Sequence, residues 1–202
     1  MTLNEFIQGF LGSDWLEITA SFCGFICVYL VIKRKLANFF FGFIQVSLYA
    51  WIFYQHQLYS DMLLQFAYIF FQVYGFLHWR KNQDSAQALI VSNQSGRQLH
   101  IWIAVGLLMS ATLGYMMATH TDADYAYPDA FTTIFSLTAQ LLMTRRQLFN
   151  WSMWILVDIV AIYIYLQKGL YPTSMLYFCF LVMAVIGQIT WYKTYQQQSH
   201  NS

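Results

Sequence analysis

The chain has 202 residues, of which 58% are hydrophobic and 9% are charged, and its formal net charge is +1. A soluble globular domain carries about 25% charged residues, so too few charges are present here to cover a water-exposed surface. The composition therefore predicts an integral membrane protein in contact with lipid. A near-neutral chain without a long basic run also argues against a nucleic-acid partner.

Seven apolar segments match or approach the ~20 residues that a spanning helix needs. In chain order they are 15–32, 36–55, 60–79, 99–119, 129–144, 150–167 and 172–192. The connections are short except for the polar stretch 80–98. Residues 1–14 lack the basic start of a secretory signal, and we expect them to lie on the membrane interface.

The chain repeats itself at a spacing of 112 residues. Thirteen of 49 positions match when residues 33–81 are placed on residues 145–193 without a gap. The matching pairs include Arg34/Arg146, Asn38/Asn150, Gln55/Gln167, Gly75/Gly187 and Trp79/Trp191. Two similar multi-helix halves are typical of transporters, in which substrate binds between the halves.

Charge gives the orientation. Alternating the seven segments across a membrane places nine of the ten Lys and Arg residues on one side, with only Lys168 opposite. The positive-inside rule then puts the N-terminus outside and the C-terminus in the cytoplasm.

The repeat and the orientation together predict an all-α membrane fold. Three helices are an odd number, so one extra helix is needed to give both copies the same orientation, and segment 99–119 supplies it. The result is a parallel 3+1+3 arrangement of seven transmembrane helices. The expected parts are an interfacial segment 1–14, a first bundle 15–81, a linker with the fourth helix 82–128, a second bundle 129–193 and a cytoplasmic tail 194–202.

Polar side chains inside apolar helices are costly and therefore indicate a site or a packing contact. Asp158 is the sharpest case, because no Lys or Arg lies at matching depth. It could be a protonated or hydrogen-bonded packing residue, a substrate contact or a proton-coupling group. Trp79 and Trp191 are expected to be interfacial anchors, and Trp151 and Trp154 could be anchors or substrate contacts. The predicted substrate-binding residues are Asn38, Gln45, Gln72, Gln140, Asn150, Trp151, Trp154 and Asp158.

An aromatic-rich cavity with amides and one carboxylate suits a planar, positively charged heteroaromatic molecule, because cations sit over indole faces and rings stack on them. The three cysteines form no ligand set with histidine, so we expect no metal and no cofactor. An intramembrane enzyme lacks support, because neither paired carboxylates nor a Ser/His/Asp arrangement occurs at a favourable spacing.

Several motifs resemble the Pnu family of bacterial vitamin transporters, over roughly residues 15–193. In the first half the resemblance lies in an N-x-x-x-G start, a Q-x-Q-L-Y turn and a Y-G-x-x-x-W end, carried by Asn38, Gly42, Gln55, Gln57, Leu58, Tyr59, Tyr74, Gly75 and Trp79. In the second half it lies in S-x-x-A-x-x-L-M-T-R, N-W-x-x-W and G-x-Y, carried by Ser136, Ala139, Leu142, Met143, Thr144, Arg145, Asn150, Trp151, Trp154, Gly169 and Tyr171.

The resemblance implies a fold similar to the full-length sugar-transporting SWEET proteins, in the bacterial inner membrane. It implies facilitated diffusion of a vitamin without ion coupling. A downstream vitamin kinase traps the vitamin by phosphorylation, with no contact between the two proteins assumed. The oligomeric state stays open, a homo-oligomer included.

The pocket departs from the branch of the family that carries nicotinamide riboside. That branch usually has Asn where this chain has Gln45, Gln72, Asp158 and Ile186, Glu at Leu176 and an apolar residue at Gln140. The thiamine-transporting branch fits the changed polar set better, so a thiamine uniporter is the leading hypothesis. The alternatives are a nicotinamide riboside transporter, a proton-coupled carrier and a receptor that does not transport.

Overall fold

The structure, a computed structural model, describes residues 15–55, 59–81, 90–93, 96–120, 125–167 and 171–200. These residues contain seven α-helices, in agreement with the number of segments expected from hydropathy. In chain order the helices are α2 (Trp15–Ile32), α3 (Asn38–Gln55), α4 (Tyr59–Lys81), α5 (Gly96–His120), α6 (Ala126–Thr144), α7 (Asn150–Gln167) and α8 (Tyr171–His200). The expected interfacial segment 1–14 lies outside the described residues.

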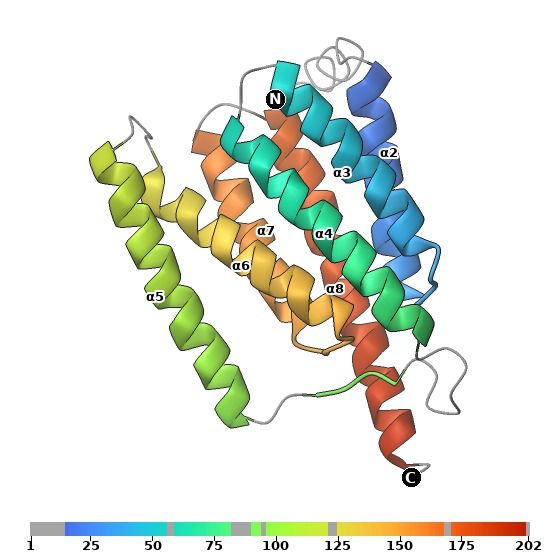
Figure 1. The fold of residues 1–202 in the computed structure, drawn as a ribbon. Helices are drawn as coiled ribbons and strands as arrows, with labels where there is room; N and C mark the ends of the chain where they lie inside the picture. The colour runs from blue at the N-terminus through green and yellow to red at the C-terminus, as the bar shows by residue number, and fades with distance from the viewer. Residues whose placement is uncertain are drawn as a thin grey trace. The chain divides into compact units, whose positions relative to one another are not determined.

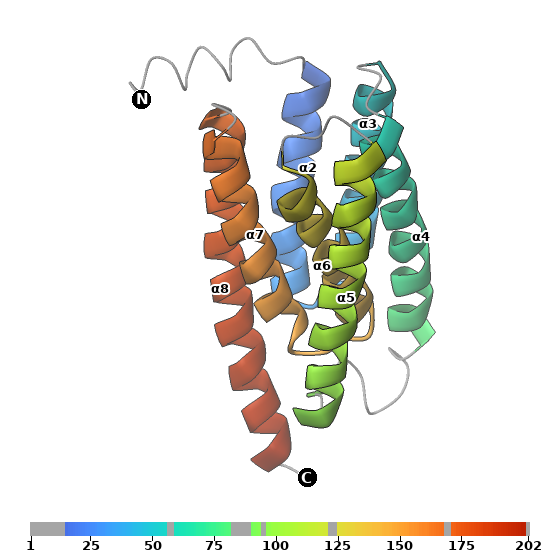
Figure 2. The same ribbon diagram turned by 90° about the vertical axis from the view of Figure 1, so that its left-hand side faces the viewer.

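The chain forms two compact units, Met1–Ile90 and Val91–Ser202. In the first unit α3 packs against both α2 and α4 (Figure 1). In the second unit each helix packs against the next in sequence, α5 on α6, α6 on α7 and α7 on α8 (Figures 1 and 2). Neighbours in the chain are thus neighbours in space within each unit, as short connections dictate.

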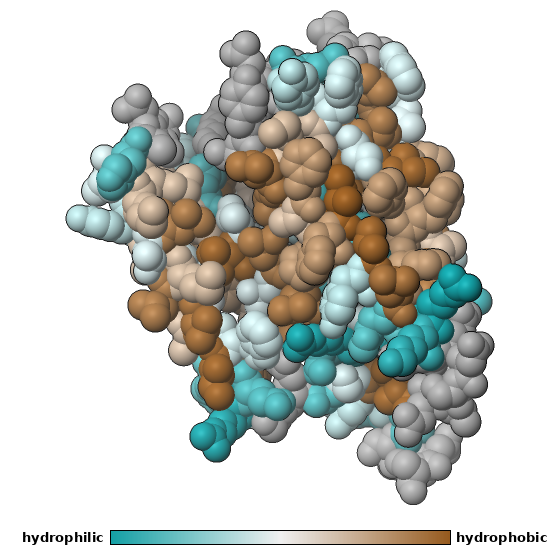
Figure 3. All heavy atoms as spheres, in the orientation of Figure 1, coloured by the Kyte–Doolittle hydropathy of each residue, from teal (hydrophilic) through white to brown (hydrophobic). Residues whose placement is uncertain are grey.

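Four helices of the described chain are long and apolar enough to cross a membrane: α2, α5, α7 and residues 174–198 of α8. Residues 38–52 of α3 form a shorter apolar helix. The face drawn in Figure 3 shows hydrophobic side chains over the middle of α4 and α5, and hydrophilic ones near both ends of α5 and near the C-terminal end of α4. Outward-facing hydrophobic residues of α5 include Ile101 and Leu108, which are 53% and 69% exposed. Exposed apolar surface of this kind is unfavourable in water and suits contact with membrane lipid.

The connection between α2 and α3 begins with a Schellman motif, the hydrogen-bonded turn that ends many helices. The Lys35 N–H donates to the Leu30 carbonyl and the Arg34 N–H donates to the Val31 carbonyl, both at 2.9 Å. Arg34 has a φ of 53°, a left-handed conformation in which glycine is the usual residue. The left-handed residue turns the chain out of the helix, and the two bonds satisfy carbonyls in the last turn of α2.

The connection between α6 and α7 has the same motif 112 residues later. The Gln147 N–H donates to the Leu142 carbonyl at 3.0 Å, and the Arg146 N–H donates to the Met143 carbonyl at 2.9 Å. Arg146 has a φ of 55°. Two helix ends with the same bonds and the same unusual residue show that the sequence repeat extends to the backbone of this connection.

The repeat also extends to one aromatic contact in each unit. Trp79 packs edge-on against Phe39, with ring centroids 5.1 Å apart, and Trp191 packs edge-on against Trp151 at 5.5 Å. Trp79 and Trp191 are both 0% exposed. The expectation that these two tryptophans anchor the helices at the interface is therefore wrong, because an anchor needs a ring that reaches the headgroups. They tie the last helix of each unit to the first turn of the preceding helix.

Several helix boundaries differ from the hydropathy-based prediction, and those of α6 and α8 have a clear physical reason. α6 begins at Ala126, before the expected start at residue 129. Pro128 is the third residue of that helix, where a missing N–H costs nothing because the first turn has no acceptor for it. α8 continues to His200, beyond the expected end at residue 192, because hydropathy marks the end of the apolar surface and not the end of the helix.

Candidate substrate-binding site

Asp158 and Gln140 are polar residues enclosed in the second unit. Asp158 lies on α7 and is 4% exposed, and Gln140 lies on the adjacent helix α6 and is 6% exposed. Asp158 follows Asn150 by eight residues, which is about 12 Å along a helix. The carboxyl group is thus well inside the apolar part of α7 and away from its polar end. A buried carboxyl needs a proton, hydrogen-bond donors or a cation.

Asn38 and Asn150 are fully buried at the first position of α3 and of α7. The Asn38 side-chain amide donates to the Lys35 carbonyl at 2.6 Å, and that of Asn150 donates to the Gln147 carbonyl at 2.8 Å. Each asparagine therefore closes the loop that precedes its helix. The Oδ1 atom of each is buried without a hydrogen-bond partner, so an acceptor remains available in both places.

Trp151 and Trp154, which the sequence places in the candidate site, have packing partners within the second unit. Trp151 is 3% exposed, and a Cβ built on Gly187 would lie 2.7 Å from three atoms of its indole. Trp154 packs against the core cluster that contains Met153 and Val157. Glycine at 187 therefore allows α8 to approach α7 closely. The Nε1 atom of Trp151 is buried without a hydrogen-bond partner.

Gln45 and Gln72 lie against glycines of neighbouring helices in the first unit. A Cβ built on Gly24 of α2 would lie 2.7 Å from Nε2 of Gln45 on α3, and one on Gly42 of α3 would lie 2.7 Å from Cδ of Gln72 on α4. Gln72 is 5% exposed, and its Oε1 has no hydrogen-bond partner. Each amide thus occupies a notch that any larger residue in place of the glycine would fill.

Two interhelical hydrogen bonds join residues that the sequence analysis did not predict as part of the site. The Ser152 hydroxyl donates to Oε1 of Gln188 at 3.1 Å, which links α7 to α8. The hydroxyls of Ser21 and Tyr49 are 3.0 Å apart, which links α2 to α3. Serine and glutamine at helix interfaces commonly make such bonds in membranes, but the sequence alone does not pair residues from different helices.

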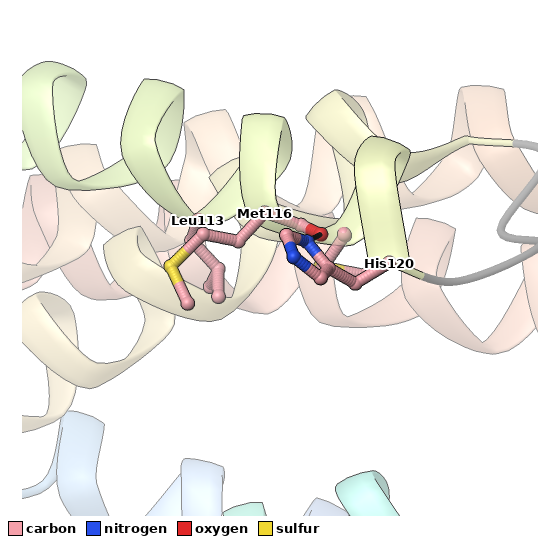
Figure 4. Close-up of a pocket in the computed structure, with 4 residues that line it drawn as sticks. Leu113, Met116 and His120 are labelled. Carbon is pink, nitrogen blue, oxygen red and sulfur yellow. Dashed lines mark hydrogen bonds between the residues drawn. The ribbon is translucent and has the colours of Figure 1, made fainter.

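A surface hollow lies on α5 and is separate from all predicted site residues. It is lined by Leu113, Met116, Met117 and His120, and the side chains drawn in Figure 4 lie along one side of the helix. The Nδ1 atom of His120 is 3.1 Å from the Met116 carbonyl of the same helix. The hollow is almost wholly apolar, so it resembles a lipid-covered surface more than a site for a charged vitamin.

The chain has the features of a multi-helix membrane transporter, namely apolar helices, two units with equivalent connections and polar side chains enclosed within them. The family model described as nicotinamide mononucleotide transporter matches residues 14–193. The chain therefore belongs to this family, which contains transporters and not enzymes, and the resemblance to the Pnu family is confirmed. It is a multi-pass protein of the inner membrane.

Curated relatives cover most of the chain. The nicotinamide riboside transporter PnuC of Escherichia coli is 26% identical over 88% of this chain and 85% of its own length. PnuC of Neisseria mucosa is 29% identical over 92% of this chain and 75% of its own length. The crystal structure of the vitamin B3 transporter PnuC is similar, with a TM-score of 0.77 and 28% identity over 95% of this chain and 86% of that one.

Proposed function

We propose that this protein takes up a small cationic heteroaromatic vitamin, with thiamine as the first candidate. The observation that carries the proposal is Asp158, a carboxyl group that is 4% exposed on an apolar helix of a transporter family. Ionisable residues inside membrane helices usually serve a substrate or ion path. A permanent cation such as the thiazolium of thiamine would pair with the carboxylate.

Amide groups supply the second part of the proposed site. Gln72 has a buried acceptor oxygen without a hydrogen-bond partner, and an aminopyrimidine offers an N–H donor of the matching kind. Gln45, which lies in the notch at Gly24, and Gln140, buried on α6, are further candidates for contacts with ring nitrogens. An unsatisfied buried acceptor costs free energy that a bound donor recovers.

Asn38, Asn150, Trp151 and Trp154 remain in the proposed site, with a second role. Their described contacts close loops or fill the core. The acceptor oxygens of the two asparagines and the Nε1 donor of Trp151 have no partner, so they are the atoms through which these residues would contact substrate.

The transport mode that we propose is facilitated diffusion by alternating access. In this mode the two three-helix bundles expected at residues 15–81 and 129–193, parallel and joined by α5, would rock about the substrate as in other transporters with parallel repeats. The equivalent Schellman motifs at Arg34 and Arg146 support equivalent construction of the units. We place the N-terminus outside and the C-terminus in the cytoplasm, where phosphorylation by a vitamin kinase would retain the vitamin.

Nicotinamide riboside is the second candidate substrate. Curated relatives that cover 85% or more of this chain are named as transporters of this molecule, and it is also a cation, so charge alone does not distinguish it from thiamine. The changed polar set favours thiamine, with Gln, Gln and Asp at 45, 72 and 158 where the nicotinamide riboside branch usually has Asn.

Binding by the purified protein decides between the two vitamins. Titration of thiamine, followed by competition with nicotinamide riboside, should give a micromolar or tighter dissociation constant for thiamine and weak displacement by the competitor. Strong binding of nicotinamide riboside with no thiamine binding would replace the first candidate by the second. Failure of both to bind would remove the cationic vitamin from the proposal.

Uptake into liposomes tests the transport mode. A uniporter equilibrates labelled vitamin across the membrane at a rate that does not depend on an imposed pH gradient. A proton-coupled carrier would accumulate vitamin when the gradient is applied, and a receptor would bind the vitamin without moving it.

A further inference from the structure

Residues 91–93, just before α5, form a short extended segment that we call the strap. The Ser92 N–H donates to the Arg146 carbonyl at 3.1 Å, and the Leu148 N–H donates to the Ser92 carbonyl at 2.9 Å. Ser92 and Gln147 are thus paired as in a parallel β-bridge. Val91 is 1% exposed. The strap is therefore a packed part of the second unit and not a loose linker.

The strap is also bonded to the last turns of α8. The Val91 N–H donates to Oε1 of Gln198 at 3.2 Å. α8 has 30 residues and is about 45 Å long, which exceeds the ~30 Å of a hydrocarbon core. Its extension past the span therefore has a contact, and three residues of extended chain join α8 to the connection between α6 and α7.

The strap is an asymmetric addition to a symmetric connection. The repeat comprises residues 33–81 and 145–193 and does not include the strap. Both connections have the same Schellman bonds. Among the backbone hydrogen bonds of the described residues, only the second connection is also paired with an extended segment, through Ser92. The additional bonds hold the turn from which α7 starts, because Leu148 lies two residues before Asn150.

We propose that the strap positions α7 and thereby its polar residues, with Val91 and Gln198 as positioning residues. A helix is stiff, so a change of direction at its first turn moves Trp154 and Asp158 farther along it. The strap holds the connection directly before that turn through its backbone bonds to Arg146 and Leu148, and Gln198 of α8 holds the strap in turn through Val91. The effect on vitamin affinity rests on the proposed function, whereas the effect on α7 does not.

Hydrogen exchange measured on the full chain in detergent tests the mechanical part. Gln198→Leu removes the acceptor at similar volume, and Gln198→Glu retains an acceptor oxygen. Gln197→Leu, on an exposed neighbour in the same helix, is the matched control. We expect exchange of the 91–93 and 148–153 peptides to be about fivefold faster in Gln198→Leu, the equivalent of one lost hydrogen bond, and unchanged in the other two variants.

Vitamin titration of the same variants tests the positioning. The dissociation constant should rise severalfold in Gln198→Leu and stay at the wild-type value in Gln198→Glu and Gln197→Leu. Unchanged exchange in Gln198→Leu would contradict the claim that Gln198 holds the strap in place. Faster exchange confined to residues 91–93 would contradict the claim that the strap holds the start of α7. Fast exchange with unchanged affinity would overturn positioning of the site. If the wild type binds no vitamin, the proposed function fails, and exchange at 148–153 still decides whether the strap fixes α7.

Discussion

The connection between α2 and α3 and the connection between α6 and α7 are alike in backbone but lead into helices with different polar residues. Both have a Schellman motif with an arginine at positive φ and an asparagine that closes the loop. Farther along the two helices, Gln45 aligns with Val157 and Val46 with Asp158. Packing follows the repeat, and the polar residues inside the helices do not.

This difference separates residues that build the fold from residues that could select a substrate. A polar residue with the same contact at the equivalent position of both units, such as Asn38 and Asn150, has a sufficient structural reason. Asp158 and Gln72 are polar residues whose counterparts, Val46 and Ala184, are apolar. The repeat therefore gives no structural reason for a polar side chain at these two positions. The unmatched residues are therefore the stronger candidates for substrate contacts.

Asp158 gives the largest predicted effect. Asp158→Ala should weaken binding of a cationic vitamin by about tenfold to a hundredfold, because hydrogen bonds to charged groups contribute about 1.5–3 kcal/mol. Asp158→Asn keeps the shape and an acceptor oxygen and should weaken binding less. The measurement is the dissociation constant of each purified variant. Wild-type affinity in both would remove Asp158 from the site, and Val46→Ala at the equivalent apolar position is the control.

Gly187 gives the next effect, on stability. A Cβ at this position would lie 2.7 Å from three atoms of the Trp151 indole, and a ring held on Trp191 cannot move easily. Gly187→Ala should therefore destabilise the protein by about 1–3 kcal/mol, as overpacking usually does. Thermal unfolding in detergent measures it. Gly96→Ala, where nothing lies within 4 Å, should leave the melting temperature close to the wild type.

The loop-closing asparagines should behave as a matched pair. Asn38→Ala and Asn150→Ala each remove a hydrogen bond to a backbone carbonyl and should each cost about 1–2 kcal/mol. Thermal unfolding of the two variants under the same conditions compares them. A large loss in one and none in the other would show that the two connections are not equivalent in energy, despite their equal bonds.

The helices could be predicted because their signal is local. The apolar runs 15–32 and 150–167 coincide with α2 and α7, since a spanning helix needs its apolar residues consecutively. The strap could not be predicted, because its partners Arg146 and Leu148 are more than 50 residues away and are met through backbone atoms. The polar stretch 80–98 has no sequence pattern that identifies residues 91–93 as a segment that forms a β-bridge.

The candidate site could be predicted in part. Polar residues in apolar helices point to enclosed positions, and Gln72, Gln140, Asn150 and Asp158 are all buried. Their separate roles were not predictable, because the local sequence does not show whether an asparagine closes a loop or faces a cavity. The bond of Ser152 to Gln188 depends on the relative rotation of two helices, which hydropathy does not fix.

The two arginines at positive φ should give the smallest effects, with a difference between the units. Glycine relieves the left-handed strain, which costs other residues about 1 kcal/mol, so the backbone contribution of Arg→Gly is favourable in both places. Arg146 is 4% exposed, and its replacement also removes a buried aliphatic stem, whereas Arg34 is only partly buried. We therefore expect Arg34→Gly to leave the melting temperature unchanged or slightly higher, and Arg146→Gly to lower it. Equal shifts in the two variants would mean that backbone strain, and not the packing of the arginine side chain, dominates at both connections.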